Sequence, residues 1–133
     1  VTGAHLRAEI GDRPIAYAMR DTILDRLSRR PEDERLGVLV CSDIWYLNND
    51  ELRACPTISI GGPGVNALAA FLVERLPSAF TVKDVLTVQM DTDFVDLIAS
   101  CWGHGTAPTR SAAEAFIARY LDLFLEKAVL RAV

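Results

Sequence analysis

One stretch of this sequence joins a strand-like run, a glycine-rich turn and a helix-like run: TISIGGPGVNALAAFLVERL, residues 57–76. Residues 57–60 are mostly β-branched, which favours a strand. Apolar residues then recur at helical spacing from Val65 to Leu76, and Pro77 ends the pattern. A strand that leads through a turn into a helix is a basic unit of α/β folds, so this stretch constrains the fold more than any other.

The segments before it continue the alternation of helix and strand. Apolar residues repeat every four positions between Asp12 and Pro31, which predicts a helix capped by Asp12 with Pro14 in its first turn. Residues 36–43, LGVLVCSD, form a short valine-rich run. Such a run predicts a strand that is covered on both faces.

The second half of the chain predicts a hairpin and a long helix. Residues 82–99 read as two extended runs that flank a turn near residues 91–93, which is typical of a β-hairpin. Thr109 and Ser111 are alternative caps for a last helix, and a broad apolar face follows them from Phe116 to Ala128.

This order of segments predicts a single α/β domain over residues 1–133. We expect three layers: a mixed, mostly parallel sheet that includes the β-hairpin, with helices on both faces. A chain of this length can bury a real core. Residues 1–11 show no periodic pattern and are expected to be extended or poorly ordered.

Composition and charge exclude several classes of function. The formal net charge of −4 opposes nucleic-acid binding, which normally requires a basic surplus. No apolar run reaches the roughly 18 residues that a membrane span needs, and no signal-like segment is present. Three cysteines without framework spacing favour a reduced compartment. We therefore expect a cytoplasmic protein that binds neither nucleic acid nor membrane.

Candidate ligand-binding residues follow three of the predicted strands. If the strands around Val38, Ile58 and Ile98 are parallel, their carboxyl ends meet at one edge of the sheet, where α/β proteins bind ligands. The candidates at that edge are Ser42, Asp43, Gly61, Gly62, Gly64, Val65, Asn66 and Trp102, together with Arg110 from the start of the last helix.

The glycine turn itself allows three interpretations. Gly62, Gly64 and Ala67 fit the spacing G-x-G-x-x-A of dinucleotide-binding turns, but the acidic residue and second half of a full dinucleotide fold are missing. A smaller ligand with a phosphate or carboxylate group would bind at the turn and the helix N-terminus, with other groups such as Arg110 supplying further binding energy. A turn with a purely structural role is the third interpretation. The sequence identifies no cofactor.

Cys101 and His104 form a second candidate site, in the stretch SCWGHG. A Cys101 thiolate with His104 as its base would suit a hydrolase or transferase. The alternative is a buried cysteine that packs as a small apolar residue. The paired spacing of a structural zinc site is absent, so the sequence predicts no metal site.

The last helix also suggests an interface. Leu123 and Leu130 lie away from the centre of its main apolar stripe, so they would be exposed on a monomer. We therefore expect a homodimer.

Binding of a small anionic ligand at residues 61–66 is the leading hypothesis, with the Cys101/His104 enzyme and a homodimeric interaction module as the alternatives.

Overall fold

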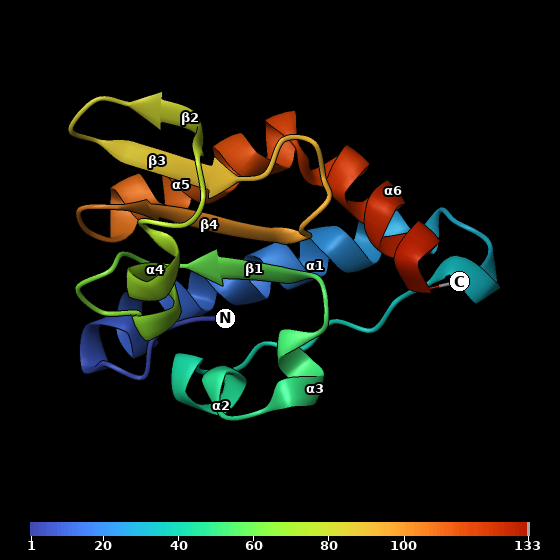
Figure 1. Cartoon of the computed structure of the whole chain (residues 1–133), viewed down its shortest axis with the longest axis horizontal. Coiled ribbons are helices and arrows are strands. Elements are labelled where there is room, and N and C mark those ends of the chain that lie inside the picture. The colour runs from blue at the N-terminus through green and yellow to red at the C-terminus, as the bar shows by residue number, and fades with distance from the viewer. Residues whose placement is uncertain (133) are drawn as a thin grey trace.

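The computed structural model describes residues 1–132 and has a four-stranded mixed sheet at its centre (Figure 1). The spatial order is β1 (Thr57–Ile60), β4 (Ile98–Gly103), β3 (Leu86–Met90) and β2 (Ser78–Val82). β1 and β4 are parallel, whereas β4–β3 and β3–β2 are antiparallel. The predicted α/β fold with a mixed sheet is confirmed. The expectation of a mostly parallel sheet is wrong, because β2, β3 and β4 are joined by two hairpins.

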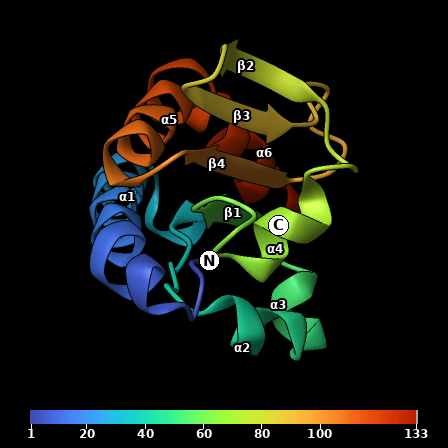
Figure 2. The same cartoon turned by 90° about the vertical axis from the view of Figure 1, so that its left-hand side faces the viewer.

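Helices flank this sheet. They are α1 (Arg13–Ser28), α2 (Asp43–Leu47), α3 (Asp50–Arg53), α4 (Ala67–Leu72), α5 (Thr106–Arg119) and α6 (Leu121–Ala132), with a π-helical turn at Ala8–Asp12 and a 3-10 turn at Glu32–Glu34. The first and last helices lie on one side of the sheet, and α4 lies on the other beside β1 (Figures 1 and 2).

Apolar side chains pack against both faces of the sheet and form two separate clusters, one on each face. The larger one joins α1, α5 and α6 to β-strand residues such as Val88, Ala99 and Cys101. The smaller one joins Tyr46 of α2 and Leu68 of α4 to Ile98 at the start of β4. Because neighbouring strand residues point to opposite faces, Ile98 and Ala99 reach different clusters. The second face is covered by short helices near β1, and the expected three-layer arrangement is not confirmed.

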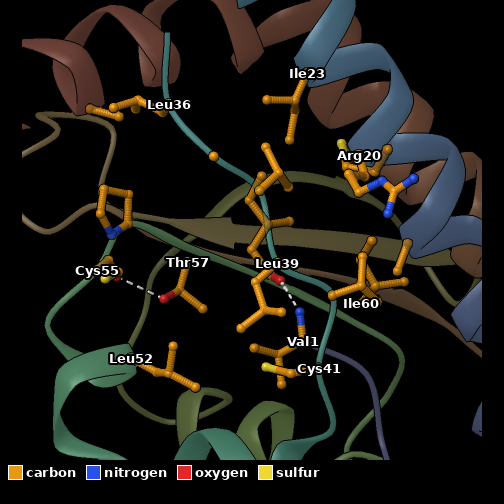
Figure 3. Close-up of a pocket in the computed structure, with 18 of the residues that line it drawn as sticks. Val1, Arg20, Ile23, Leu36, Leu39, Cys41, Leu52, Cys55, Thr57 and Ile60 are labelled. Carbon is orange, nitrogen blue, oxygen red and sulfur yellow. Dashed lines mark hydrogen bonds between the residues drawn. The ribbon is translucent and has the colours of Figure 1, made fainter.

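Residues 36–43 do not form the predicted strand. The side chains of residues 36–40 alternate between half-buried and exposed as in a strand, Leu39 is 59% exposed, and Asp43 already belongs to α2. Within the described chain, however, no backbone hydrogen bond joins residues 36–40 to a neighbouring strand. A cavity of about 220 Å³ separates the segment from β1, as Figure 3 shows around Leu36, Leu39 and Thr57. The valine-rich pattern predicted an extended segment correctly, but within residues 1–132 no neighbouring strand pairs with it.

Val1 and Thr2 fill the end of that gap. The Val1 nitrogen donates to Ile58 O at 2.7 Å, and Ile60 N donates to Val1 O at 2.9 Å. Thr2 N donates to Cys41 O at 3.0 Å, and a single parallel bridge pairs Thr2 with Ser42. These two residues therefore connect β1 to the end of the unpaired segment.

The N-terminal residues differ from expectation. Residues 1–11 were expected to be extended or poorly ordered, but only the first few are extended, and helical structure begins at Leu6. It continues through the π-helical turn into α1, so Asp12 lies inside a continuous helical segment and its side chain makes no capping bond. The cap predicted from Asp12 and Pro14 is therefore wrong, although a helix over residues 13–28 is present.

The last helical segment is divided and begins earlier than predicted. α5 starts after Gly105, whose φ of 107° is accessible to glycine at little cost, and Pro108 fits within its first turn. Thr109 and Ser111 therefore lie inside the helix rather than at its cap. Tyr120 interrupts the helix, and its hydroxyl donates to Ala79 O of β2 at 3.1 Å. This contact ties the break to the edge strand.

Candidate functional site

A cleft of about 790 Å³ opens beyond the carboxyl ends of β1 and β4. Its walls are residues 10–12, 62–65 and 102–106, together with Arg7 and Thr109. We call this the β1–β4 cleft. Its volume is in the range of small-molecule sites, and its position is the edge at which α/β sheets commonly bind ligands.

The end of β4 forms a rigid wall of the cleft. Thr109 Oγ1 accepts from Gly103 N and donates to Gly103 O, both at 3.2 Å, which fixes the strand end to α5. The Trp102 indole N–H donates to Gln89 Oε1 at 3.4 Å, and its ring lies edge-to-face with His104 at 5.9 Å. A Cβ built on Gly62 would lie 3.5 Å from this indole, so the glycine turn packs closely against it.

The N-terminus of α5 supplies backbone donors at the cleft. Gly105 gives no side-chain cap to this 14-residue helix, and Pro108 has no N–H group. The amides of Thr106 and Ala107 are among those that an α-helix leaves without an internal partner. Because the positive end of the helix dipole lies at this terminus, an anionic group is favoured there by up to about 2 kcal/mol when partly buried.

Asp12 is the acidic side chain of the cleft, and sequence reasoning missed this role. It is 6% exposed, and within residues 1–132 its carboxylate has no hydrogen-bond or ion-pair partner. A Cβ built on Gly61 would lie 2.4 Å from Asp12 Oδ2, so the glycine leaves room for the carboxylate in this position. Burial raises the pKa of Asp12 from 3.8 to about 6.

The π-helical turn at Ala8–Asp12 positions this carboxylate. Arg13 N donates to Ala8 O, a bond that spans five residues and widens the helix by one residue. Gly11 is then so close to α5 that a Cβ would lie 2.4 Å from Thr106 Oγ1. Single π-helical turns of this kind occur frequently at functional sites.

The start of α4, by contrast, is already occupied by the protein's own side chains. Asn66 Oδ1 accepts from Leu68 N at 2.9 Å and from Ala69 N at 3.3 Å. Asp43 Oδ2 accepts from Ala67 N at 2.7 Å. An external anion at this terminus would have to displace both side chains. The expected site at the α4 N-terminus is therefore corrected: Asp43 and Asn66 have structural roles.

The remaining predicted ligand-binding residues fall into two groups. Gly62, Gly64, Val65 and Trp102 line the β1–β4 cleft, and Gly61 lies beside Asp12. Ser42 does not line the cleft, since its hydroxyl accepts from Trp45 N at 3.3 Å and caps α2. Arg110 is exposed on α5 and also lies outside the lining of the cleft.

The Cys101/His104 hypothesis is not supported by the geometry. Cys101 is fully buried in the larger apolar cluster, and burial raises the pKa of its thiol to about 12. His104 is exposed and lines the cleft. Because the pleat directs Cys101 to the core face, its thiol reaches neither solvent nor the cleft. We therefore correct this interpretation in favour of a core cysteine.

The cavity beside residues 36–41 is a smaller second candidate. It is lined mostly by apolar side chains of α1, β1 and α6, as Figure 3 shows for Ile23 and Ile60, and its polar lining includes Arg20, Tyr46 and Thr57. Among residues 1–132, no group of three His, Cys, Asp or Glu side chains is arranged to hold a metal ion. In the same part of the chain, no helix has the length and apolarity to cross a membrane.

The exposed leucines of α6 lie where the sequence predicted. Leu123 is 44% exposed and Leu130 is 63% exposed. The homodimer inferred from them stays a prediction.

Six residues that line the cleft lie outside the two stretches predicted from the sequence, residues 61–66 and 100–105: Arg7, Ile10, Gly11, Asp12, Thr106 and Thr109. Gly11 and Asp12 precede a helical pattern, where glycine and aspartate are ordinary, so only their tertiary contacts identify them.

Comparison of the chain with models of known protein families, with curated proteins and with solved structures found no match.

Proposed function

We propose that this protein binds a small molecule with a phosphate or carboxylate group in the β1–β4 cleft. The observation that supports this most strongly is the convergence of three elements on one cleft: the glycine turn after β1, the end of β4 and the uncapped start of α5. The anionic group would lie at the amides of Thr106 and Ala107, where the helix dipole is favourable. This site replaces the α4 terminus expected from the sequence.

Arg7 and the apolar lining supply the further binding energy. A helix N-terminus contributes at most about 2 kcal/mol, whereas even millimolar affinity requires about 4 kcal/mol. Arg7 lies at the edge of the cleft, and its guanidinium has no ion-pair partner among the described residues. Ile10, Pro63 and Val65 offer apolar contacts to the rest of the ligand. Together these groups can account for a ligand of micromolar to millimolar affinity.

Replacement of Gly64 by isoleucine tests the proposal. No atom lies within 4 Å of a Cβ built on Gly64, and its φ is outside the left-handed region, so the fold should tolerate the new side chain. Because Gly64 lines the cleft, the added volume should block it. We expect a thermal-shift screen of phosphates, nucleotides and organic acids to find a ligand of the wild-type protein, and Gly64→Ile to weaken its binding at least tenfold.

Gly37→Ile is the matched control. Gly37 also has no atom within 4 Å of a built Cβ, and it lies outside the β1–β4 cleft. Its affinity for the ligand should stay within twofold of the wild-type value. Equal binding by Gly64→Ile and wild type, or a screen without any ligand, would contradict the proposed function.

A further inference from the structure

The unpartnered carboxylate of Asp12 restricts the kind of ligand that the β1–β4 cleft can hold. A buried ionised group without hydrogen bonds is costly, so natural proteins rarely keep one without a reason. Asp12 is 6% exposed as a residue and lines the cleft, and its carboxylate oxygens retain contact with the open cleft while having no partner within the described chain. A ligand that supplies the missing partner would recover the cost of burying it.

We propose that the ligand carries a cationic amine in addition to its anionic group, with the amine bound to Asp12 and the anionic group bound at the first turn of α5. This inference rests on the proposed function and specifies the ligand class for the same cleft.

Charge decides between an amine and a second anionic group at Asp12. With a pKa of about 6, roughly nine-tenths of the Asp12 side chains are ionised at pH 7. An ionised carboxylate repels a phosphate or carboxylate and binds a cationic N–H donor more strongly than a neutral hydroxyl. The anionic group of the ligand is therefore directed away from Asp12, to the amides of Thr106 and Ala107 and to Arg7.

The two cleft walls opposite Asp12, the glycine turn and the start of α5, carry no cationic side chain that could pair with its carboxylate. Residues 61–66 and 106–109 contain no titratable side chain. On its own helical segment, Arg13 is paired with Glu9 at 3.4 Å, and Arg7, which also lines the cleft, is exposed to solvent and forms no ion pair with the Asp12 carboxylate within the described chain. His104 lines the cleft from the loop after β4 and is exposed. The carboxylate is thus left available to a bound molecule.

Calorimetric titration with matched probes tests the inference. O-phosphoethanolamine and ethyl phosphate differ by one amine, as do L-glutamate and glutarate. At pH 7.5 the amine member of at least one pair should bind at least ten times more tightly than its partner. Asp12→Asn should reduce that preference to less than twofold, whereas Asp21→Asn, an exposed change on α1, should preserve it.

The pH dependence supplies an independent readout. Protonation of Asp12 removes the charge that holds the amine, so the preference for the amine probe over its amine-free partner, in which changes of phosphate charge cancel, should be about tenfold smaller at pH 5 than at pH 7.5. Because His104 also borders the cleft, the assignment to Asp12 requires that Asp12→Asn abolish this change. A preference for the amine probe that is as large or larger at pH 5 would overturn the inference.

The outcomes separate the inference from the proposed function. Equal binding of amine and amine-free probes in the cleft would overturn the inference and leave the proposed function standing, whereas absence of binding by all four probes would overturn both. If Asp12→Asn does not fold, ¹³C NMR of the Asp12 carboxyl in the wild-type protein replaces it. Saturation with O-phosphoethanolamine should then lower the pKa of Asp12 by about one unit, and an unchanged pKa would contradict the inference.

Discussion

Asp12→Asn should make the protein more stable at pH 8, by about 2 kcal/mol in the free energy of unfolding. Burial raises the pKa of Asp12 from 3.8 to about 6, and two pKa units correspond to about 3 kcal/mol that the ionised group costs the folded state. The carboxylate borders the open cleft, which reduces this cost. A neutral amide of the same shape avoids most of it.

The gain should depend on pH in a defined direction. Above pH 6 the wild-type carboxylate is ionised in both folded and unfolded chains, and the full cost applies. As pH falls from 6 to 4, the folded state takes up the proton first, so the wild-type protein recovers stability and the advantage of Asp12→Asn disappears. Chemical denaturation at pH 8 and pH 4 measures both values. A variant less stable than wild type at pH 8 would contradict an unpartnered carboxylate, and Asp21→Asn should show no gain at either pH.

Asp43→Ala should have the largest destabilising effect of the changes considered for this chain. The Asp43 carboxylate is 4% exposed and accepts from Ala4 N at 3.1 Å, Ile44 N at 2.7 Å and Ala67 N at 2.7 Å. It thereby joins the N-terminal segment, α2 and α4. Loss of these bonds leaves three backbone donors without an acceptor, and we expect a loss of about 3 kcal/mol in the free energy of unfolding.

Asp33→Ala is the matched control, since Asp33 is exposed in the 3-10 turn and should tolerate the change within about 0.5 kcal/mol. Urea unfolding followed by circular dichroism measures both variants. A loss below 1 kcal/mol for Asp43→Ala would show that Asp43 does not hold the start of α4, and would return it to the candidate ligand-binding residues.

The sequence predicted local structure well where the pattern was self-contained. β1 has its predicted bounds, and the hairpin of β3 and β4 follows the two extended runs. The strand β2 was missed because its side chains are mostly exposed or half-buried and show no marked apolar alternation. Residues 36–43 gave a correct extended backbone and a wrong strand, since pairing depends on a neighbour that no local pattern specifies.

The site shows the same division. The carboxyl ends of β1 and β4 were predicted to meet, and the parallel pair brings Gly62 and Trp102 together. Sequence could not show that Asp43 binds the backbone of α4, because Asp43 and Ala67 are 24 residues apart. Asn66 caps α4 locally through Leu68 N and Ala69 N, and the sequence reasoning missed this cap although asparagine is a common N-cap residue. Asp12 lies at the cleft because the π-helical turn at Ala8–Asp12 places it there, and the sequence has no distinct signal for such a turn.

NMR titration of the ¹⁵N-labelled protein with O-phosphoethanolamine and ethyl phosphate determines whether a small ligand occupies the β1–β4 cleft. We expect saturable shifts of the Gly62, Gly105 and Thr106 amides and of the Trp102 indole N–H, all at the walls of the cleft. Shifts confined to the cavity between α1 and residues 36–41, or no saturable shift at 10 mM of either probe, roughly the weak end of small-ligand affinity, would contradict binding in the cleft.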